Sequence, residues 1–342
     1  MNGKVKHKQL LVSVLMPAFN AEKYLREAMD SILAQTCADW ELIAVNDCST
    51  DRTKEIILSY SDVRIRYFEN ETNLGIAATR NRAIMEATGK YCAVMDADDI
   101  SHPERLAKQV SFLRLHPDHV ICGTLAKTFG VESRKMILPL QDEIIRCALL
   151  FQCTFIHSSV MIRTDALKQL KYGQFSQSED LDLWVRIAVQ RTGKMHNLNG
   201  QFIRYRVHEA SASNTFNNIQ RQMARKIHRR YLSESLDVNP SEEELDVHFM
   251  AVPVAKFADM PEARKRLPDL KKWMQTLWRA NGRTRYFNRS HFAAYLWFRW
   301  LLACLFLKRY GEMPSLGIPV SPKTLSWILS MFMERIIIKL NR

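Results

Sequence analysis

The stretch that decides the fold is YCAVMDADD, residues Tyr91–Asp99, a short apolar run that ends in the carboxylates Asp96, Asp98 and Asp99. Apolar runs bounded by polar turn residues are typical of buried strands in a parallel sheet. In open α/β sheets, ligands bind outside the carboxyl ends of such strands. Three acidic groups there repel one another, which predicts a bound divalent cation that itself holds a phosphate. A simpler alternative is a capping cluster, with Asp99 or Ser101 at a helix N-cap and Pro103 at or near the first turn.

On both sides of this stretch, strand patterns alternate with helical ones. Strands are expected at residues 10–16, 40–45, 63–68, 91–95, 120–129, 158–163 and 201–207. Helices are expected at residues 21–35, 53–60, 76–88, 103–116, 143–151, 164–170 and 181–190. Strands alternating with helices at this spacing predict βαβ units with right-handed crossovers. The fold class is therefore α/β, with a doubly wound, mostly parallel, Rossmann-like sheet.

The composition is that of a globular protein whose partners are anionic. The chain has 342 residues, of which 47% are hydrophobic, so it can form two domains or one large domain with an appendage. Its net charge of +13 favours nucleotides, nucleic acid or an anionic membrane surface. The seven cysteines form no CxxC or CxxxC pair, which predicts reduced thiols in a cytosolic protein.

The sequence pattern changes near residue 220. We expect a domain boundary there, between a catalytic region of residues 1–219 and a helical region of residues 220–342. Two apolar, aromatic segments with basic residues lie in that region, at Tyr295–Leu307 and Thr324–Arg342. Both are short for a spanning helix and resemble helices that lie in a membrane interface. A helical hairpin packed on the catalytic domain or on a second subunit has the same composition. The basic N-terminus leads into a first strand rather than a signal peptide.

Three side chains near the ends of the first three strands suit a nucleotide. Phe19 can present its ring to a nucleobase or pack in the core. Asp47 can accept an N–H from the base, although a helix N-terminal turn explains it nearly as well. Arg80 can meet a diphosphate or lie on a solvated helix face. Each signal is weak alone, and their common position at successive strand ends strengthens them.

Several segments in this order and spacing resemble family 2 glycosyltransferases, the GT-A fold enzymes that use nucleotide sugars. The segments are LVSVLMPAFNAEKYLREAMDSILAQT (residues 11–36), VNDCSTD (45–51), NLGIAATRNRAI (73–84), GKYCAVMDADDISHPERL (89–106), SEDLDLWVRI (178–187) and YRVHEASAS (205–213). The resemblance covers about residues 10 to 215. Within the family, it is to bacterial transferases that build lipooligosaccharide, capsule or O-antigen chains.

The resemblance implies a role for each residue of the donor site. Pro17, Ala18 and Phe19 would line the pocket for uracil or another base, and Asp47 would hydrogen-bond that base. Arg80 would lie near the diphosphate. The family's paired acids after the second strand are here Asn46 and Asp47, so the second position is retained.

The acidic cluster and one histidine would form the metal side. Asp96 and Asp98 match the family's DxD motif, with Asp96 toward the ribose and Asp98 on Mn²⁺ or Mg²⁺. Asp99 is an alternate ligand, because some members use the adjacent acid. His208 would face the metal or the diphosphate, and its bland alternative is a structural histidine.

Asp180 matches the general base, with Glu179 as a neighbour that shapes its environment. An acid at a helix start normally has a low pKa, so Asp180 needs burial or the like charge of Glu179 to act as a base. The bland alternative is an acidic pair at a helix start. Single displacement would invert the anomeric centre. No QxxRW segment typical of processive members occurs, which favours the addition of one sugar per encounter.

The expected activity is transfer of one sugar from a nucleotide-diphosphate sugar, by default UDP-linked, to a saccharide or lipid-linked acceptor in cell-surface polysaccharide or lipopolysaccharide synthesis. The expected location is cytoplasmic, peripheral on the inner face of the cytoplasmic membrane. A nucleotidyltransferase would need a glycine-rich phosphate loop after the first strand, where the chain has residues 17–20, PAFN. A nucleic-acid-binding protein would explain the charge, but its aromatic and basic platforms are missing.

Overall fold

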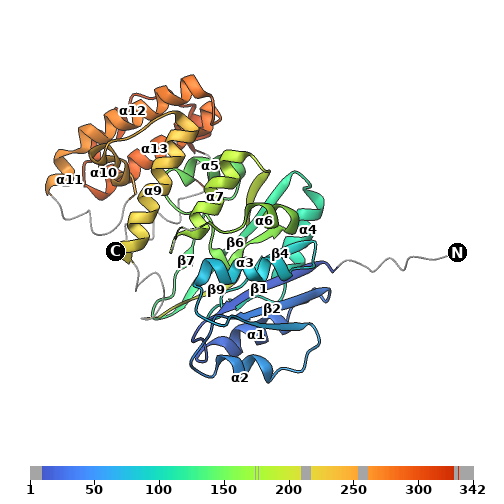
Figure 1. Ribbon diagram of the computed structural model, residues 1–342. Helices are drawn as coiled ribbons and strands as arrows, with labels where there is room; N and C mark the ends of the chain where they lie inside the picture. Colours follow the sequence, from blue (N-terminus) through green and yellow to red (C-terminus); the bar gives the residue numbers. More distant parts are fainter. Residues whose placement is uncertain are drawn as a thin grey trace. The chain divides into compact units, whose positions relative to one another are not determined.

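The computed structural model describes residues 10–173, 175, 177–208, 217–252, 261–326 and 330, which are coloured by sequence in Figure 1. Contacts divide the chain into two compact units. Unit 1 is Met1–Leu138 with Phe155–Gln220, and unit 2 is Pro139–Thr154 with Arg221–Arg342. The sequence analysis assigns residues 139–154 to the first region, whereas the structure groups them with the C-terminal helices.

Unit 1 is built on one twisted sheet. Its strands are β1 (Val12–Ala18), β2 (Trp40–Asn46), β3 (Ile65–Glu69), β4 (Tyr91–Val94), β5 (Ile100–Ser101), β6 (His119–Gly130), β7 (Lys135–Met136), β8 (Met161–Arg163) and β9 (Lys194–Val207). Their order is β3-β2-β1-β4-β8-β6-β9-β5, with β7 paired to β6. The first four in this order are parallel, and β8 is antiparallel to both β4 and β6. β9 runs parallel to β6, and β5 is antiparallel to β9.

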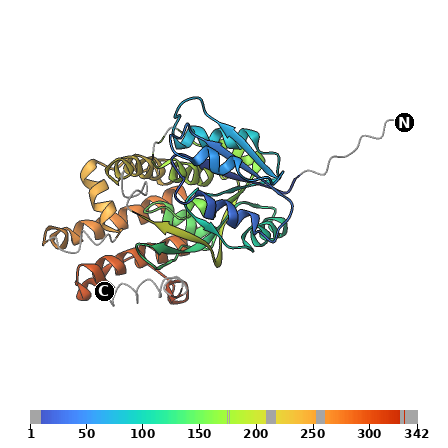
Figure 2. The same ribbon diagram turned by 90° about the horizontal axis from the view of Figure 1, so that it is seen from below.

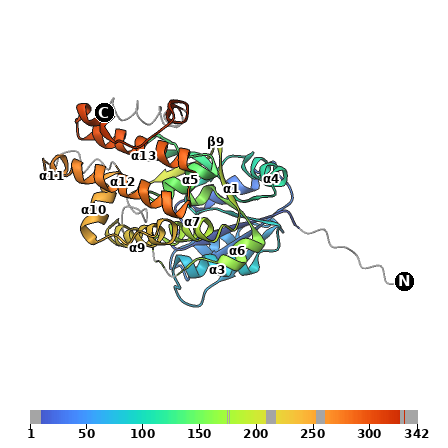
Figure 3. The ribbon, with the colours of Figure 1, turned by 90° about the horizontal axis from the view of Figure 1, so that it is seen from above.

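Helices cover both faces of this sheet. They are α1 (Leu25–Leu33), α2 (Thr53–Leu58), α3 (Ile76–Glu86), α4 (Arg105–Leu115), the 3₁₀ turn η1 (His157–Ser159), α6 (Thr164–Leu170) and α7 (Glu179–Gln190). In Figure 3, α1 and α4 lie on one face, and α3 and α6 lie on the other. All seven residues of β1 are buried, because the strand lies between β2 and β4 and is covered from both sides.

The register brings the carboxyl ends of the parallel strands to one edge. Ala18 pairs with Asn46, and Asn46 pairs with Glu69, so β1, β2 and β3 end at the same level. β4 ends earlier, where Val94 pairs with Leu15 of β1. The acidic residues 96–99 therefore follow β4 directly at this edge.

The predicted α/β class and the helical C-terminal region are confirmed, and most predicted elements lie within a few residues of the observed ones. The last strand is longer than predicted, because its first part, from Lys194, pairs with β6. The short strands β5 and β7 were not expected, since each has only two residues; β5 pairs with the distant β9, and β7 pairs back on β6. The antiparallel direction of β8 has no signal in the local sequence.

Unit 2 is helical. Its elements are α5 (Asp142–Leu149), α9 (Asn217–Leu236, which begins in unit 1), α10 (Glu242–Met250), α11 (Pro261–Lys265), α12 (Leu267–Thr284), α13 (Arg289–Phe306) and the 3₁₀ turn η3 (Tyr310–Ser315). Figure 2 shows the helices from α9 onward in yellow to red, whereas α5 is green. α13 packs against α5 and α12.

The apolar segment Tyr295–Leu307 forms most of α13 and is buried in unit 2. Tyr295 and Trp300 are fully buried, and Arg299 is 2% exposed. Arg299 donates a hydrogen bond to Gln152 (2.8 Å). The structure therefore favours the packed alternative over a membrane-surface helix for this segment. Among the described residues, no helix is long and apolar enough to cross a membrane. Most of the segment at 324–342 lies outside the described residues.

Two buried histidines in unit 2 are kept neutral, both by burial and His248 also by the hydrogen bond that it accepts. His248 donates from Nε2 to the Leu150 carbonyl (2.7 Å), and its Nδ1 accepts from the Trp273 indole N–H (3.0 Å). His228 bonds the Leu149 carbonyl through Nδ1 (3.0 Å). Burial lowers the pKa of His228 to about 4 and the pKa of His248 to about 3. Protonation of Nδ1 of His248 would place a second proton against the indole N–H.

We expect the free energy of unfolding to fall as the pH drops from about 6.5 toward these lowered pKa values. Unfolded histidines take up protons in that window and folded ones do not, so each contributes up to about 1.4 kcal/mol per pH unit. Urea unfolding at pH 7.5 and 5.5 would measure the loss. A His248→Gln variant keeps a side-chain N–H donor and cannot titrate, so it should show a weaker pH dependence. An identical dependence in the variant and the parent would contradict this account.

Candidate active site

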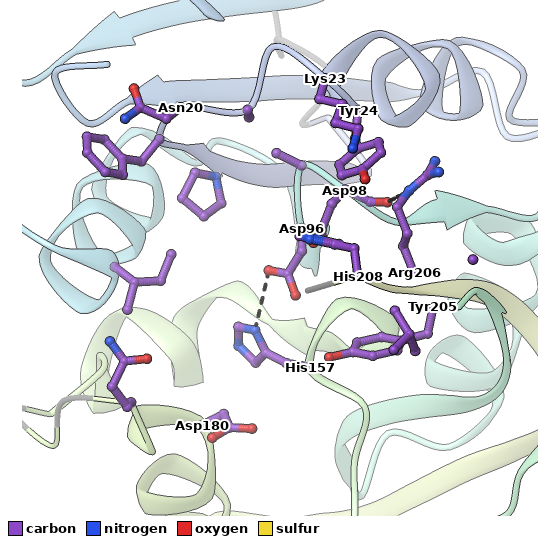
Figure 4. Close-up of a pocket in the computed structure, with 18 of the residues that line it drawn as sticks. Asn20, Lys23, Tyr24, Asp96, Asp98, His157, Asp180, Tyr205, Arg206 and His208 are labelled. Atoms are coloured by element: carbon purple, nitrogen blue, oxygen red, sulfur yellow. Dashed lines mark hydrogen bonds and ion pairs between the residues drawn. The ribbon is translucent and has the colours of Figure 1, made fainter. Parts of the chain in front are cut away.

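A cavity of about 970 Å³ opens in unit 1 at the carboxyl ends of β1, β4 and β9. This volume is in the range of small-molecule sites. The loop after β1 contributes Phe19, the loop after β4 contributes Asp96 and Asp98, and the end of β9 is followed by His208. The first turn of α7 adds Asp180 (Figure 4). The cavity thus combines side chains from segments far apart in the sequence.

Arg80 of α3 bridges two acidic side chains at the floor of the cavity. Its guanidinium donates to Asp96 Oδ1 (3.0 Å) and to Glu179 Oε1. Arg80 is 6% exposed. Burial alone would lower its pKa, but the carboxylates of Asp96 and Glu179 raise it, so the side chain stays charged. The expected position of Arg80 beside a diphosphate differs from this geometry, in which its donors are directed at two carboxylates of the protein.

Asp96 is held in its ionised form. Burial alone would raise its pKa, but Arg80 and then His157 outweigh burial and keep the pKa well below its usual value. His157 Nδ1 lies 3.8 Å from Asp96 Oδ1, and its Nε2 forms a hydrogen bond with the Tyr172 hydroxyl (2.8 Å). Asp96 is therefore an anionic side chain lining the cavity, and Arg80 and His157 set its orientation.

Asp98 has the opposite electrostatic setting. Burial and the charge of Asp96 raise its pKa, although a hydrogen bond with His208 acts against this shift. The distance from His208 Nε2 to Asp98 Oδ2 is 3.0 Å, and the Asp98 side chain is 36% exposed. A carboxylate crowded by a like charge and open to a cavity is stabilised by an added cation. Carboxylate oxygens with one imidazole fit Mn²⁺, and the oxygens alone fit Mg²⁺.

Asp99 does not line the cavity, and its expected role as an alternate ligand stays a prediction. The residue is 1% exposed. Its carboxylate accepts hydrogen bonds from the Ser158 hydroxyl and from the backbone N–H of Arg206 (2.8 Å). Burial, followed by the charges of Asp98 and Asp96, raises its pKa well above the usual value. Asp99 therefore ties the loop after β4 to η1 and to β9.

One end of the cavity, where the resemblance implies a nucleobase, is formed by the end of β1. Pro17 and Phe19 line it, and the Phe19 ring is 50% exposed. Ala18 is buried between them and is absent from the lining residues. An exposed phenylalanine at a cavity mouth offers a flat apolar face for a ring.

Asp47 lies beneath this region and holds the start of α3. The side chain is 3% exposed and is not among the lining residues. Its oxygens accept from the backbone N–H groups of Leu74 and Gly75, each at 2.9 Å. Gly75 has φ +81°, a conformation that favours glycine. The helix-terminus alternative describes Asp47 better than direct contact with a base.

Asp180 lies in the first turn of α7 and lines the cavity. Figure 4 shows it on the opposite side of the drawn pocket from Asp98, with His157 between them in this view. Its Oδ1 accepts from the backbone N–H of Leu181 (2.7 Å), and a helix N-terminus favours a negative charge there. Glu179 is 6% exposed and pairs with Arg80, so it positions α7.

Sequence reasoning missed His157 and Arg206. His157 lies just before β8, and because β8 is antiparallel to β4, its start meets the end of β4. Arg206 donates from Nε to the Asp98 carbonyl (2.8 Å) and pairs with Glu27 (3.1 Å). The segment YRVH was noted for its histidine alone. Knowledge of the strand direction would have drawn attention to His157.

Comparison with known proteins identifies the family. Residues 13–170 match the model of the family described as Glycosyl transferase family 2. The UDP-Glc:alpha-D-GlcNAc-diphosphoundecaprenol beta-1,3-glucosyltransferase WfgD of Escherichia coli is 31% identical over 217 residues, which cover 62% of this chain and 83% of WfgD. The chain belongs to glycosyltransferase family 2. The putative glycosyltransferase EpsE of Bacillus subtilis (strain 168) is 38% identical over 186 residues, covering 51% of this chain and 66% of EpsE.

Solved structures show the same fold. The crystal structure of S. aureus TarS 1–349 in complex with UDP-GlcNAc superposes with a TM-score of 0.57 at 18% identity, covering 88% of this chain and 92% of that one. At this identity the likeness concerns the fold alone, and it confirms the GT-A fold expected from the sequence. Membership of this family favours a glycosyltransferase over the nucleotidyltransferase and the nucleic-acid-binding protein that the sequence left as alternatives.

We expect Arg80→Ala to destabilise unit 1 by about 3 kcal/mol or more, because it leaves two buried carboxylates without their cation. Urea unfolding at pH 7.5 measures the effect. Arg52→Ala is a matched control, since Arg52 pairs with Glu55 at 3.0 Å on the exposed surface. Loss of that pair should cost under about 1 kcal/mol. Equal, small effects of the two variants would show that the Arg80 bridge contributes little.

Proposed function

We propose that this family 2 glycosyltransferase moves one sugar, with inversion, from a nucleotide-diphosphate sugar to a saccharide or lipid-linked acceptor. The observation that supports this most directly is the arrangement of acids around one cavity. Asp98 and His208 lie on one side, and Asp180 lies on the other (Figure 4). Inverting displacement needs such an arrangement, because the leaving diphosphate and the attacking hydroxyl lie on opposite faces of the sugar ring.

Asp180 is the general base in this proposal. Its carboxylate would accept the proton from the acceptor hydroxyl as that oxygen attacks the anomeric carbon. Its hydrogen bond with the N–H of Leu181 fixes the orientation of the carboxylate at the start of α7. Glu179 and Arg80 hold the first turn of α7 in place, so the base keeps its distance from the donor.

Asp98 and His208 would hold Mn²⁺ or Mg²⁺. When bound, such an ion supplies positive charge that stabilises the departing diphosphate. Asp96 keeps a fixed negative charge beside them and would accept a hydrogen bond from the ribose. Lys23 also lines the cavity, on the Asp98 side in Figure 4, and would give the diphosphate a cationic partner that Arg80 cannot.

The donor we propose is UDP-linked, and the pathway is cell-surface polysaccharide synthesis. WfgD is named as a UDP-Glc-dependent transferase acting on a diphosphoundecaprenol-linked sugar, and TarS was solved with UDP-GlcNAc. Pro17 and Phe19 offer the apolar surface that a base requires. A lipid-linked acceptor would bring the enzyme to the inner face of the cytoplasmic membrane, where a net charge of +13 favours anionic headgroups.

The first experiment is donor binding against UDP-, GDP- and dTDP-sugars, with Mn²⁺ or with EDTA. We expect one donor to bind in a metal-dependent way and Asp98→Asn to weaken its binding at least tenfold, because the variant loses the anionic oxygen. Asp62→Asn alters an acid outside the cavity that pairs with Arg64 and serves as the control. Binding that ignores both the metal and Asp98 would reject the proposed metal site.

The base is tested separately by Asp180→Asn. We expect kcat to fall by about 10²–10⁴-fold while donor affinity stays within about twofold, because only proton transfer is lost. Asp165→Asn is a close structural control. Asp165 lies in the first turn of α6, and its Oδ1 accepts from the next backbone N–H (2.9 Å), as in Asp180. Normal turnover in Asp180→Asn would exclude Asp180 as the base.

A further inference from the structure

A second cluster of potential metal ligands lies at the opposite edge of the sheet from the cavity. It consists of His116, Asp118 and His119, at the junction between the end of α4 and the beginning of β6. β6 begins at His119 and ends at Gly130, which lines the cavity. At about 3.3 Å per residue, this strand separates the two sites by on the order of 30 Å. The cluster is therefore independent of the proposed glycosyl-transfer chemistry.

One potential ligand atom from each of the three side chains lies within 4.8 Å of the others. His116 and Asp118 are exposed, and His119 is partly buried. His119 Nδ1 lies 2.8 Å from Asp118 Oδ1. An ion bound to both His119 Nδ1 and Asp118 Oδ1 would take the place of the proton that these two atoms share. Small rotations of the exposed His116 and Asp118 side chains would bring all three ligand atoms within bonding distance of one ion.

The backbone of this turn is held in place by a cation from β8. Arg163 donates to the carbonyls of Leu113 (2.8 Å), His119 (2.8 Å) and His116 (3.3 Å). The Asp118 carbonyl accepts from the backbone N–H of Lys194 (2.8 Å). The ligands are therefore presented by a turn whose backbone is fixed by hydrogen bonds to β8 and β9, which lowers the conformational cost of binding.

The imidazoles of the cluster are packed around Phe112. The His116 and His119 rings lie with their centroids 4.4 Å and 5.1 Å from that of Phe112, and 5.3 Å from each other. His196 stacks on the same phenyl ring at 4.4 Å. Lys194 Nζ bonds Asp118 Oδ2 at 2.8 Å, but both side chains are more than half exposed. A pair this exposed competes only weakly with a metal.

We propose that His116, Asp118 and His119 bind a borderline transition-metal ion, with Zn²⁺ as the physiological candidate. Two imidazoles and one carboxylate form a donor set that Zn²⁺ uses and that Mg²⁺ does not. The bound ion would join the end of α4 to the beginning of β6. It would stabilise unit 1 and would take no part in catalysis.

The test is Zn²⁺ titration of the full, chelator-treated chain by calorimetry and thermal unfolding, with excess Mg²⁺ present to compete for the acidic cavity. We expect one Zn²⁺ per chain and a melting temperature raised by about 5 °C when Zn²⁺ exceeds Kd by a hundredfold. His116→Ala and His119→Ala should each lower the Zn²⁺ affinity at least tenfold. Circular dichroism and donor binding would show that these variants are folded.

Two controls locate the site. His102→Ala removes an exposed histidine elsewhere in unit 1, and Asp98→Asn weakens any Zn²⁺ binding in the cavity. Both should retain the Zn²⁺ affinity and the thermal shift of the parent. Zn²⁺ binding that persists in the His116→Ala, His119→Ala double variant, or that is lost in Asp98→Asn, would overturn the proposal. No Zn²⁺ binding below millimolar concentration would do the same.

Discussion

Three carboxylates gathered at the end of β4 impose the main constraint on unit 1, because cations from other elements must balance them. Arg80 comes from α3, Arg105 from α4 and Arg206 from β9. Arg105 is fully buried and donates to the carbonyls at the ends of the β4 and β8 contact, Val94 (2.8 Å) and Val160 (3.2 Å). Burial lowers its pKa to about 10, and Asp99 and Asp96 act in the opposite direction. Arg105 therefore remains charged at neutral pH and joins the parallel half of the sheet to its antiparallel strand.

Arg80 not only balances charge but also links two elements of the site. One guanidinium binds Asp96, which follows β4, and Glu179, which begins α7. The proposed donor side and the proposed base side of the cavity are thus connected through a single rigid planar group. Fixed geometry between reacting groups is a large part of enzymatic rate enhancement. A lysine could not replace this arginine, because its single ammonium lacks the fork that reaches both acids.

The sequence predicts the layout of the sheet but only part of the site. Alternating apolar and helical patterns are local, so the strands around β1 and the acidic stretch after β4 could be recognised. The partners of Asp47, Arg80 and Asp99 are set by tertiary packing, and a motif assigns them a ligand although the fold gives them hydrogen bonds within the protein. His157 escaped notice because its place depends on the direction of β8, which no local pattern encodes.

The three acids after β4 show how position alone gives one residue type three roles. Asp96 lies beside Arg80 and is held ionised, with its pKa well below the usual value. Asp99 is enclosed by Ser158 and the Arg206 backbone, and its raised pKa favours the protonated form. Asp98 is the one of the three whose pKa is raised while its side chain remains 36% exposed. A positive charge in the cavity would stabilise it, whereas Asp96 already has such a neighbour in Arg80 and Asp99 is closed to solvent. The electrostatics of the fold therefore favour Asp98 as the position at which a metal-bound diphosphate would bind.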